Sequence, residues 1–243
     1  MTGSIAFLSE TRSDCDLNAC GLTLNIGRQR LTEEEFNALL LKAQKEGVLE
    51  RQVKMLKGEV VNTSENRQAL HTSLRSEDPA SPHYEEVNET RERMYALAEA
   101  VRNGQWLGAT GKKITDVINV GIGGSEMGPH AVYHALRDIN PSIRLHFLSA
   151  VDGVLADRIL GVLNPETTLT VISSKSFSTR ETMLNAELVN EWYEKAGIRT
   201  QKERACHVFL VSAKESACQE MNLPEENRFP IWSWVGGRFS VWG

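Results

Sequence analysis

The sequence ITDVINVGIGGSEMGPHAVYHALRD, residues 114–138, joins an apolar run to a glycine-rich turn and then to a segment compatible with a helix. Glycines let the backbone turn sharply and bring its N–H groups close to a ligand. The helix that follows adds unpaired N–H donors and the positive end of its dipole. Because this arrangement is typical of phosphate binding, we expect Gly123, Gly124 and Ser125 to face a phosphorylated ligand.

Two other interpretations of this loop stay open on these residues alone. A dinucleotide-binding loop of the form Gly-x-Gly-x-x-Gly would need glycine at position 126, where the chain has Glu126. Such folds also carry an acidic residue about twenty positions later, and no residue clearly fills that place, although Asp152 lies further on. The second interpretation is a tight turn with a purely structural role.

Composition and charge narrow the class of protein. The 243 residues, with 41% hydrophobic and 24% charged side chains, are ordinary for a soluble globular protein of one large or two modest domains. A net charge of −5 without a Lys/Arg stripe disfavours a nucleic-acid partner. No apolar run is long enough for a membrane helix, and the N-terminus lacks the pattern of a secretory signal. We therefore expect a cytoplasmic protein with no membrane partner.

The four cysteines do not predict a metal site. Cys15, Cys20, Cys206 and Cys218 form no CxxC pair and show no spacing typical of zinc ligands. In a reducing compartment we expect free thiols, with a Cys15–Cys20 bridge as the alternative.

Residues 1–109 are predicted to form a mainly helical N-terminal segment. Thr32 and Glu35 form a capping-box pattern before an apolar periodicity of helical spacing, and a further turn could continue to Lys57. A second amphipathic helix is expected from Tyr84 to a stop signal at Asn103-Gly104. Residues 1–30 show no clear period and are expected to be an irregular or partly extended arm.

Residues 110–243 are predicted to form an α/β domain. Helical segments, the clearest at Thr179–Lys195, separate four apolar runs, which lie at Ile114–Ile122, Ile143–Ser149, Thr168–Ser173 and His207–Ser212. Strands that alternate with helices of this length indicate a parallel sheet flanked by helices. Ligands of such sheets bind beyond the carboxyl ends of the strands, where the glycine loop and a second polar loop both fall.

The second loop, SSKSFST at residues 173–179, offers five hydroxyl groups and one ammonium group within seven residues. A phosphate carries up to two negative charges and three strong acceptor oxygens, which suit clustered hydroxyl and N–H donors. We expect Ser174, Lys175, Ser176 and Thr179 to bind phosphate together with Ser125. The alternative is that these residues only cap the following helix, although one Ser or Thr would be enough for that.

A third feature is WSWVGGRFS, residues 232–240. The two glycines before Arg238 allow a close backbone approach that could aim the guanidinium group into a cleft. Arginine does not deprotonate in practice, so Arg238 would be a poor base but a good stabiliser of a developing oxyanion. A surface ion pair or a cation–π contact with a tryptophan is the alternative.

Together these segments resemble the glucose-6-phosphate isomerase (phosphoglucose isomerase) family of the sugar-isomerase-domain superfamily. The similarity covers most of the chain from Gly58 onward and is carried by GEVVNTSENRQALHTSLR (58–75), TGKKITDVINVGIGGSEMGP (110–129), NPETTLTVISSKSFSTRETM (164–183) and WSWVGGRFSVW (232–242). The resemblance implies a three-layer sandwich of the sugar-isomerase type. It also implies reversible aldose–ketose isomerisation of glucose 6-phosphate and fructose 6-phosphate through a cis-enediol, in a homodimer without metal or organic cofactor.

In this family picture the phosphate lies at Ser125, Ser174, Lys175, Ser176 and Thr179, and Arg238 stabilises the charge on the enediol oxygens. The chain departs from the family pattern at a few positions, which are Glu126, Met127, Ser176, Arg180 and Ser233. Arg180 could add positive charge beside the phosphate, and the change at Ser233 could alter the orientation of Arg238. For Glu65, Arg67 and His71, a helix-packing or salt-bridge role is favoured over a role in the site.

Family members are considerably longer, and their glutamate base, ring-opening histidine and catalytic lysine lie downstream of the VGGRFS segment. The resemblance is therefore to an N-terminal portion, and we expect the 243-residue chain alone to be inactive. A general base must reach the proton that it removes, and the sequence places none here. A non-enzymatic sugar-phosphate sensor is the alternative, and an aminosugar-phosphate isomerase domain is a third, less consistent with VGGRFS.

Overall fold

The structure, a computed structural model, describes residues 16–27, 29–136 and 142–242. It divides into two compact units, Met1–Val53 and Lys54–Gly243, which are described separately. The domain boundary expected after residue 109 stays a prediction. Cys20, Cys206 and Cys218 are free thiols, whereas Cys15 lies outside the described residues.

The first unit contains a short hairpin and helical segments. Strands β1 (Asp16–Ala19) and β2 (Leu22–Asn25) pair antiparallel, and α1 (Glu33–Lys45) follows. The predicted capping box is confirmed, because the Thr32 side chain accepts from the Glu35 N–H while the Glu35 carboxylate accepts from the Thr32 N–H. Helix α2 (Val48–Leu56) begins in this unit, and neither helix buries a residue.

The second unit is built on a five-stranded sheet in the order β4-β3-β5-β6-β7, and every neighbouring pair is parallel. The strands are β3 (Asp116–Val120), β4 (Arg144–Leu148), β5 (Thr168–Ser173), β6 (Val208–Ser212) and β7 (Arg228–Pro230). The first four confirm the predicted strands. The fifth was not predicted, because three residues ending in proline carry no recognisable strand pattern.

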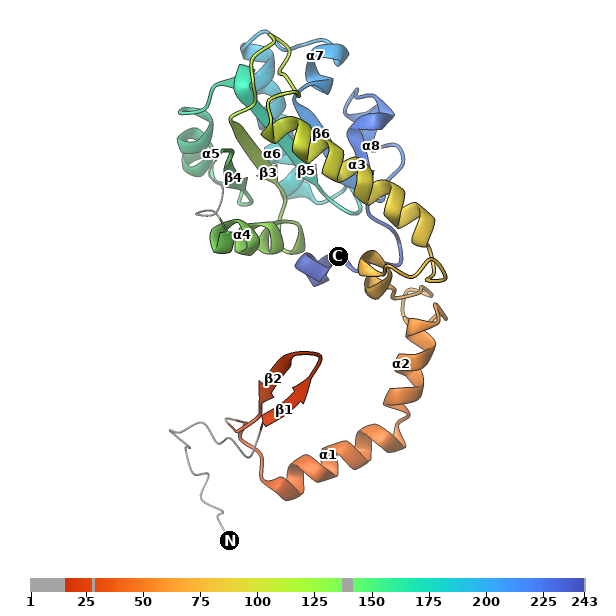
Figure 1. Cartoon of the computed structure of the whole chain (residues 1–243). Coiled ribbons are helices and arrows are strands. Elements are labelled where there is room, and N and C mark those ends of the chain that lie inside the picture. The colour runs from red at the N-terminus through yellow and green to blue at the C-terminus, as the bar shows by residue number, and fades with distance from the viewer. Residues whose placement is uncertain (1–15, 28, 137–141, 243) are drawn as a thin grey trace. The chain divides into compact units, whose positions relative to one another are not determined.

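Helices cover both faces of the sheet, which confirms the three-layer α/β fold (Figure 1). Helix α3 (Tyr84–Arg102) packs with Val101 against Leu169 and Phe209 on one face. On the other face Ile118, Ile172 and Leu210 pack against three helices, which are α5 (Gly153–Leu160), α6 (Arg180–Lys195) and α8 (Ala217–Glu220). Successive residues of each strand point to opposite faces, so the near-continuous apolar runs fill two cores.

The strand order reverses at β3, since β4 lies on one side of it and β5 on the other. Ligands of open parallel sheets bind beyond the strand ends at such a point. Val120 pairs with Ile172, so β3 and β5 end side by side. The glycine loop after β3 and the serine loop after β5 are thereby brought together.

At the amino ends of the strands, away from the two loops, the Asp116 carboxylate is 2% exposed and is hydrogen-bonded by three side chains. Arg144 donates to it through two nitrogens, both at 2.8 Å, and Thr115 and His146 contact it at 2.7 and 2.9 Å. Burial acts to raise the pKa of Asp116, but the hydrogen bonds from Arg144, His146 and Thr115 outweigh it and lower the pKa to about 2. This ionised group ties β3 to β4.

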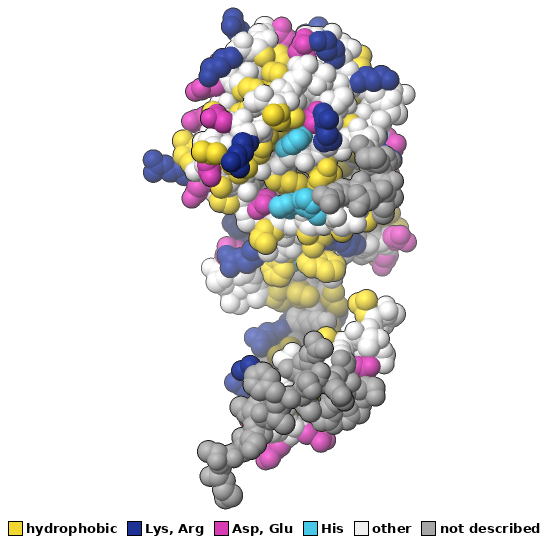
Figure 2. Space-filling model, turned by 90° about the vertical axis from the view of Figure 1, so that its left-hand side faces the viewer, with side chains coloured by type: hydrophobic (Ala, Val, Ile, Leu, Met, Phe, Trp, Pro, Cys, Tyr) yellow, Lys and Arg dark blue, Asp and Glu magenta, His cyan; other side chains and the backbone are white. Residues whose placement is uncertain are grey.

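On the face seen in Figure 2, lysine, arginine and acidic side chains are interspersed and form no large patch of a single sign. Within the part of the chain that the structure describes, no helix is both long and apolar enough to cross a membrane.

Candidate functional site

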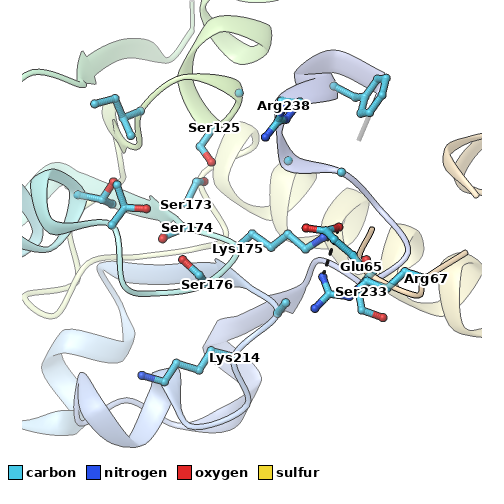
Figure 3. Close-up of a pocket in the computed structure, with 18 of the residues that line it drawn as sticks. Glu65, Arg67, Ser125, Ser173, Ser174, Lys175, Ser176, Lys214, Ser233 and Arg238 are labelled. Carbon is cyan, nitrogen blue, oxygen red and sulfur yellow. Dashed lines mark hydrogen bonds and ion pairs between the residues drawn. The ribbon is translucent and has the colours of Figure 1, made fainter. Parts of the chain in front are cut away.

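A cavity of about 940 Å³ opens beyond the carboxyl ends of β3 and β5. The serine loop and residues 62–67 supply most of its polar side chains, and the glycine loop and the start of the 3₁₀ helix η5 (Gly237–Trp242) add Ser125 and Arg238. The hydroxyl groups of Ser125, Ser173, Ser174 and Ser176 gather on one side of it (Figure 3). The three sequence features predicted to carry chemistry therefore meet in one place.

Hydrogen bonds to residues 211–213, at the end of β6, hold the serine loop in place. The Ser174 N–H donates to the Val211 carbonyl oxygen at 3.0 Å, and the Lys175 carbonyl oxygen accepts from Ala213 and from the Ser212 hydroxyl. Phe177 has a left-handed backbone (φ 49°), which disfavours a large side chain, and its ring is buried in the core. Burial of this ring offsets the backbone strain and anchors the turn.

Two hydroxyl groups beside this cavity lack partners. Ser174 is 4% exposed and Thr182 is 2% exposed, and neither side-chain oxygen has a hydrogen-bond partner among the described residues. A buried polar group without a partner is unfavourable, so each such hydroxyl calls for an explanation such as a ligand. Thr179 is the N-cap of α6, yet its side chain makes no cap hydrogen bond. The capping interpretation of the serine loop is therefore not what the geometry shows.

Two helices begin at the cavity. Helix α4 (Gly124–Leu136) starts at the glycine loop, and α6 starts just after Thr179. Each presents the positive end of its dipole, although in α4 the Ser125 and Glu126 N–H groups already donate to the Ile122 and Gly123 carbonyl oxygens. The two dipoles favour an anion beside the helix starts.

The glycines of the first loop have a second role, which sequence analysis missed. A Cβ on Gly124 would lie 2.8 Å from the Gly237 carbonyl carbon, and one on Gly128 would lie 2.6 Å from the Val241 nitrogen. Gly124 and Gly128 are four residues apart and so share one face of α4. Their missing side chains let η5 lie directly against this helix. Their spacing was the signal that could have revealed this packing.

Arg238 projects into the cavity from η5 towards Ser125 (Figure 3). Its side chain is exposed and has no hydrogen bond or ion pair to any described residue. The surface ion pair considered for it is absent from this described part of the chain. A permanently charged group with no partner is available to an anionic ligand.

Lys175 lies differently from the expectation. Its ammonium group donates to the carbonyl oxygens of Ser233, at 3.1 Å, and Val235. In Figure 3 it extends away from the serine hydroxyls towards Glu65 and Arg67. Burial, and then the charge of Arg67, lower the pKa of Lys175, while Glu65 acts in the opposite direction. Lys175 lines the cavity, but in this structure it braces the VGGRFS segment.

Other charged residues line the cavity or lie outside it. Glu65 and Arg67 line it and form an ion pair of 4.0 Å, in keeping with the expected salt-bridge role. Lys214 lines it too, but its ammonium group pairs with Glu220 at 2.7 Å. Arg180 is exposed and is not among the lining residues. Within the described ranges, no cluster of three His, Cys, Asp or Glu residues could hold a metal ion.

The phosphoglucose isomerase family matches residues 25–243, which is most of the chain. The chain belongs to this family. It is 42% identical over 227 residues to the glucose-6-phosphate isomerase of Paraburkholderia phymatum and 43% identical over 223 residues to that of Paraburkholderia xenovorans. These matches cover 93% and 91% of this chain, which spans 42% and 41% of the length of those relatives.

One solved structure agrees with the family assignment, and a second shows the same fold. The crystal structure of a glucose-6-phosphate isomerase from Chlamydia trachomatis superposes with a TM-score of 0.75 at 27% identity. The superposition covers 99% of this chain and 46% of the Chlamydia trachomatis chain. A hypothetical protein from Thermus thermophilus shares the fold, with a TM-score of 0.59 at 24% identity over 87% of this chain and 44% of its own.

Proposed function

We propose that this chain supplies the phosphate-binding and oxyanion-stabilising part of a site that interconverts glucose 6-phosphate and fructose 6-phosphate. The observation that carries the proposal is the unpartnered, buried Ser174 hydroxyl between the N-termini of α4 and α6. Phosphate oxygens accept from hydroxyl and N–H donors, and both helix dipoles favour its charge. Ser125, Ser176 and Thr179 complete the donors around this position.

Arg238 supplies the second part of the proposed chemistry. Aldose–ketose isomerisation removes a proton beside the carbonyl group, so negative charge develops on the oxygens of a cis-enediol. An unpaired guanidinium group stabilises this charge without taking part in proton transfer. Because the charge develops only on the way to the intermediate, its contact with Arg238 strengthens where catalysis requires it.

Proton transfer also needs a base within hydrogen-bond reach of the reacting carbons. Glu65 is the one carboxylate that lines the cavity in the described part of the chain, and it is paired with Arg67 and Asn62. We therefore propose that the complete site takes its base from residues outside this chain, and that the chain alone binds sugar phosphate without turning it over. The family resemblance further supports a cytoplasmic homodimer that needs no cofactor.

Calorimetry tests the binding, and a coupled assay for fructose 6-phosphate, which should detect no turnover by the chain alone, tests the lack of a base. The chain should bind glucose 6-phosphate at least tenfold more tightly than glucose, because hydrogen bonds to a charged group contribute about 1.5 to 3 kcal/mol each. Equal affinity for the two sugars would overturn the proposal.

A non-enzymatic sugar-phosphate sensor is the second candidate, and the lack of a free carboxylate among the described lining residues favours it. The two candidates separate in a polypeptide of the relatives' full length that contains this chain. An isomerase would interconvert the two sugar phosphates, whereas a sensor would bind them unchanged.

A further inference from the structure

The segment Leu70–Arg75 makes hydrogen bonds to residues on both sides of Arg238 in the sequence. The Leu70 N–H donates to the Trp234 carbonyl oxygen at 3.1 Å, ahead of the two glycines. The Arg75 guanidinium group donates to the carbonyl oxygens of Val241 and Trp242, beyond Arg238. The 3₁₀ helix η2 (His71–Arg75) therefore fixes where the VGGRFS segment enters and leaves the cavity wall.

His71 makes the contacts nearest to Arg238. Its Nε2 accepts a hydrogen bond of 2.8 Å from the Gly236 N–H, and its ring centroid lies 4.4 Å from that of Phe239. Gly236 and Phe239 enclose Gly237 and Arg238 in the sequence, so one imidazole ring holds both ends of the turn that presents the guanidinium group. Gly236 has little space, since a Cβ there would lie 2.8 Å from the Phe239 ring.

The Gly236 hydrogen bond requires a neutral imidazole with an unprotonated Nε2, because a protonated ring has only donors. The charged groups around His71 are Arg75 on its own helix, Lys175 from the serine loop, and Glu65, and all three line one apolar cavity with it. Burial lowers the pKa of His71 and outweighs the opposite effect of the Gly236 hydrogen bond, and the charges of Lys175 and Arg75 lower the pKa further. The imidazole ring that accepts the Gly236 hydrogen bond is therefore the neutral form.

We propose that His71 is a positioning residue for Arg238: it holds the Gly236–Phe239 turn so that the guanidinium group faces the position of the enediol oxygens. The inference rests on the proposed function of Arg238. It gives His71 a role beyond the helix packing or salt bridge expected from sequence. The role depends on an acceptor at Nε2 and is lost when the ring is protonated.

A pair of ligands isolates the contact with Arg238. Arabinonate 5-phosphate carries a carboxylate where the enediol oxygens would lie, and arabinitol 5-phosphate has the same phosphate without that charge. The ratio of their dissociation constants, measured by calorimetry on the 243-residue chain, reports the carboxylate contact alone. The wild-type chain should prefer arabinonate 5-phosphate, and Arg238→Ala should abolish the preference.

Substitutions at His71 then test the inference. His71→Leu should reduce the preference about fivefold, as expected for one lost hydrogen bond. His71→Gln, whose amide oxygen can accept near the Nε2 position, should keep most of it. His71→Leu combined with Arg238→Ala should show the same ratio as Arg238→Ala alone, because both changes act through one contact. A folded His71→Leu chain with the wild-type ratio would overturn the inference.

A pH profile provides a readout that does not depend on the leucine variant folding. As the pH falls through the pKa of His71, the wild-type preference should decrease because the ring becomes protonated, whereas the preference of His71→Gln should stay constant. Both ligands carry the same phosphate, so its own titration cancels in the ratio. Parallel profiles would overturn the inference. A wild-type chain without any preference would instead refute the proposed function of Arg238, and this inference with it.

Discussion

The Ser240 hydroxyl donates a hydrogen bond of 2.7 Å to the Gly124 carbonyl oxygen, which joins the VGGRFS segment to the start of α4. These residues are 116 positions apart in the sequence. Ser240 has a positive φ of 54°, an uncommon backbone conformation for serine that this bond helps to offset. The contact places Arg238 beside the glycine loop and so connects the two halves of the proposed site.

Gly124→Ala should disrupt this junction. The new Cβ would overlap the Gly237 carbonyl group, and neither backbone can move without breaking the fit. We expect a loss of about 2 kcal/mol in the free energy of unfolding, typical of overpacking, and weaker binding of arabinonate 5-phosphate. Urea unfolding and calorimetry would measure the two effects.

Gly237→Ala is the matched control, because a Cβ there meets no atom within 4 Å and the residue does not have a positive φ. It should change stability by less than about 0.5 kcal/mol. If Gly124→Ala were as well tolerated as this control, the close packing of α4 on η5 would not matter for stability.

Ser174→Ala should separate binding from stability. Removing a buried hydroxyl that lacks a partner should leave the free energy of unfolding unchanged or raise it by up to about 1 kcal/mol. The same change should weaken binding of glucose 6-phosphate about tenfold, because it removes a donor to a charged group. Ser216→Ala, which removes a hydroxyl group that does not line the cavity, is the control for binding. Unchanged affinity in Ser174→Ala would remove this hydroxyl from the site.

Lys175→Ala should show the opposite balance. The ammonium group holds the Ser233 and Val235 carbonyl oxygens, so its loss should lower the free energy of unfolding by about 1 to 3 kcal/mol. Affinity for glucose 6-phosphate should fall as well if the segment loosens. A variant with wild-type stability and greatly weakened binding would show that Lys175 serves the phosphate alone, as the sequence pattern suggested.

The Asp116 carboxylate should make stability depend on pH. Its pKa is about 2 in the folded chain and near 3.8 when exposed, so the unfolded chain takes up the proton first as the pH falls. Its contribution of about 2 kcal/mol is present above pH 4 and is lost between pH 3.8 and pH 2.

The comparison with Asp116→Asn isolates this group from other carboxylates. At pH 7 the variant should be less stable than wild type by about 2 kcal/mol, and the difference should shrink as the pH falls below 3.8. Urea unfolding from pH 7 to pH 3 measures the difference. A difference that does not change with pH would mean that Asp116 is not held ionised by Arg144 and its other partners.

Much of the fold could be predicted from the sequence because its signals are local. The apolar runs that became β3, β5 and β6 are bounded by loops and separated by helices, and Thr32 and Glu35 lie at capping-box spacing. The gathering of Ser125 and Ser174 could also be predicted, since parallel strands place their carboxyl ends at one edge.

The missed features depend on contacts between distant segments. The direction of Lys175 is set by carbonyl groups some 60 residues away, and no local pattern encodes that choice. A glycine at position 124 is compatible both with a phosphate-binding loop and with close packing against another segment, because both need a backbone without a side chain. The role of His71 follows from Gly236, which is 165 positions away. Tertiary contact, rather than residue type, decided each of these.

The most direct test of the central claim is a titration of the ¹⁵N-labelled chain with glucose 6-phosphate, followed through its backbone amide resonances. Binding between the two helix starts should shift the amide signals of Gly123, Gly124 and Ser125 together with those of Ser174–Thr179, and glucose should leave them in place. Saturating glucose 6-phosphate without a shift in either loop, or with shifts confined to other segments, would contradict the account.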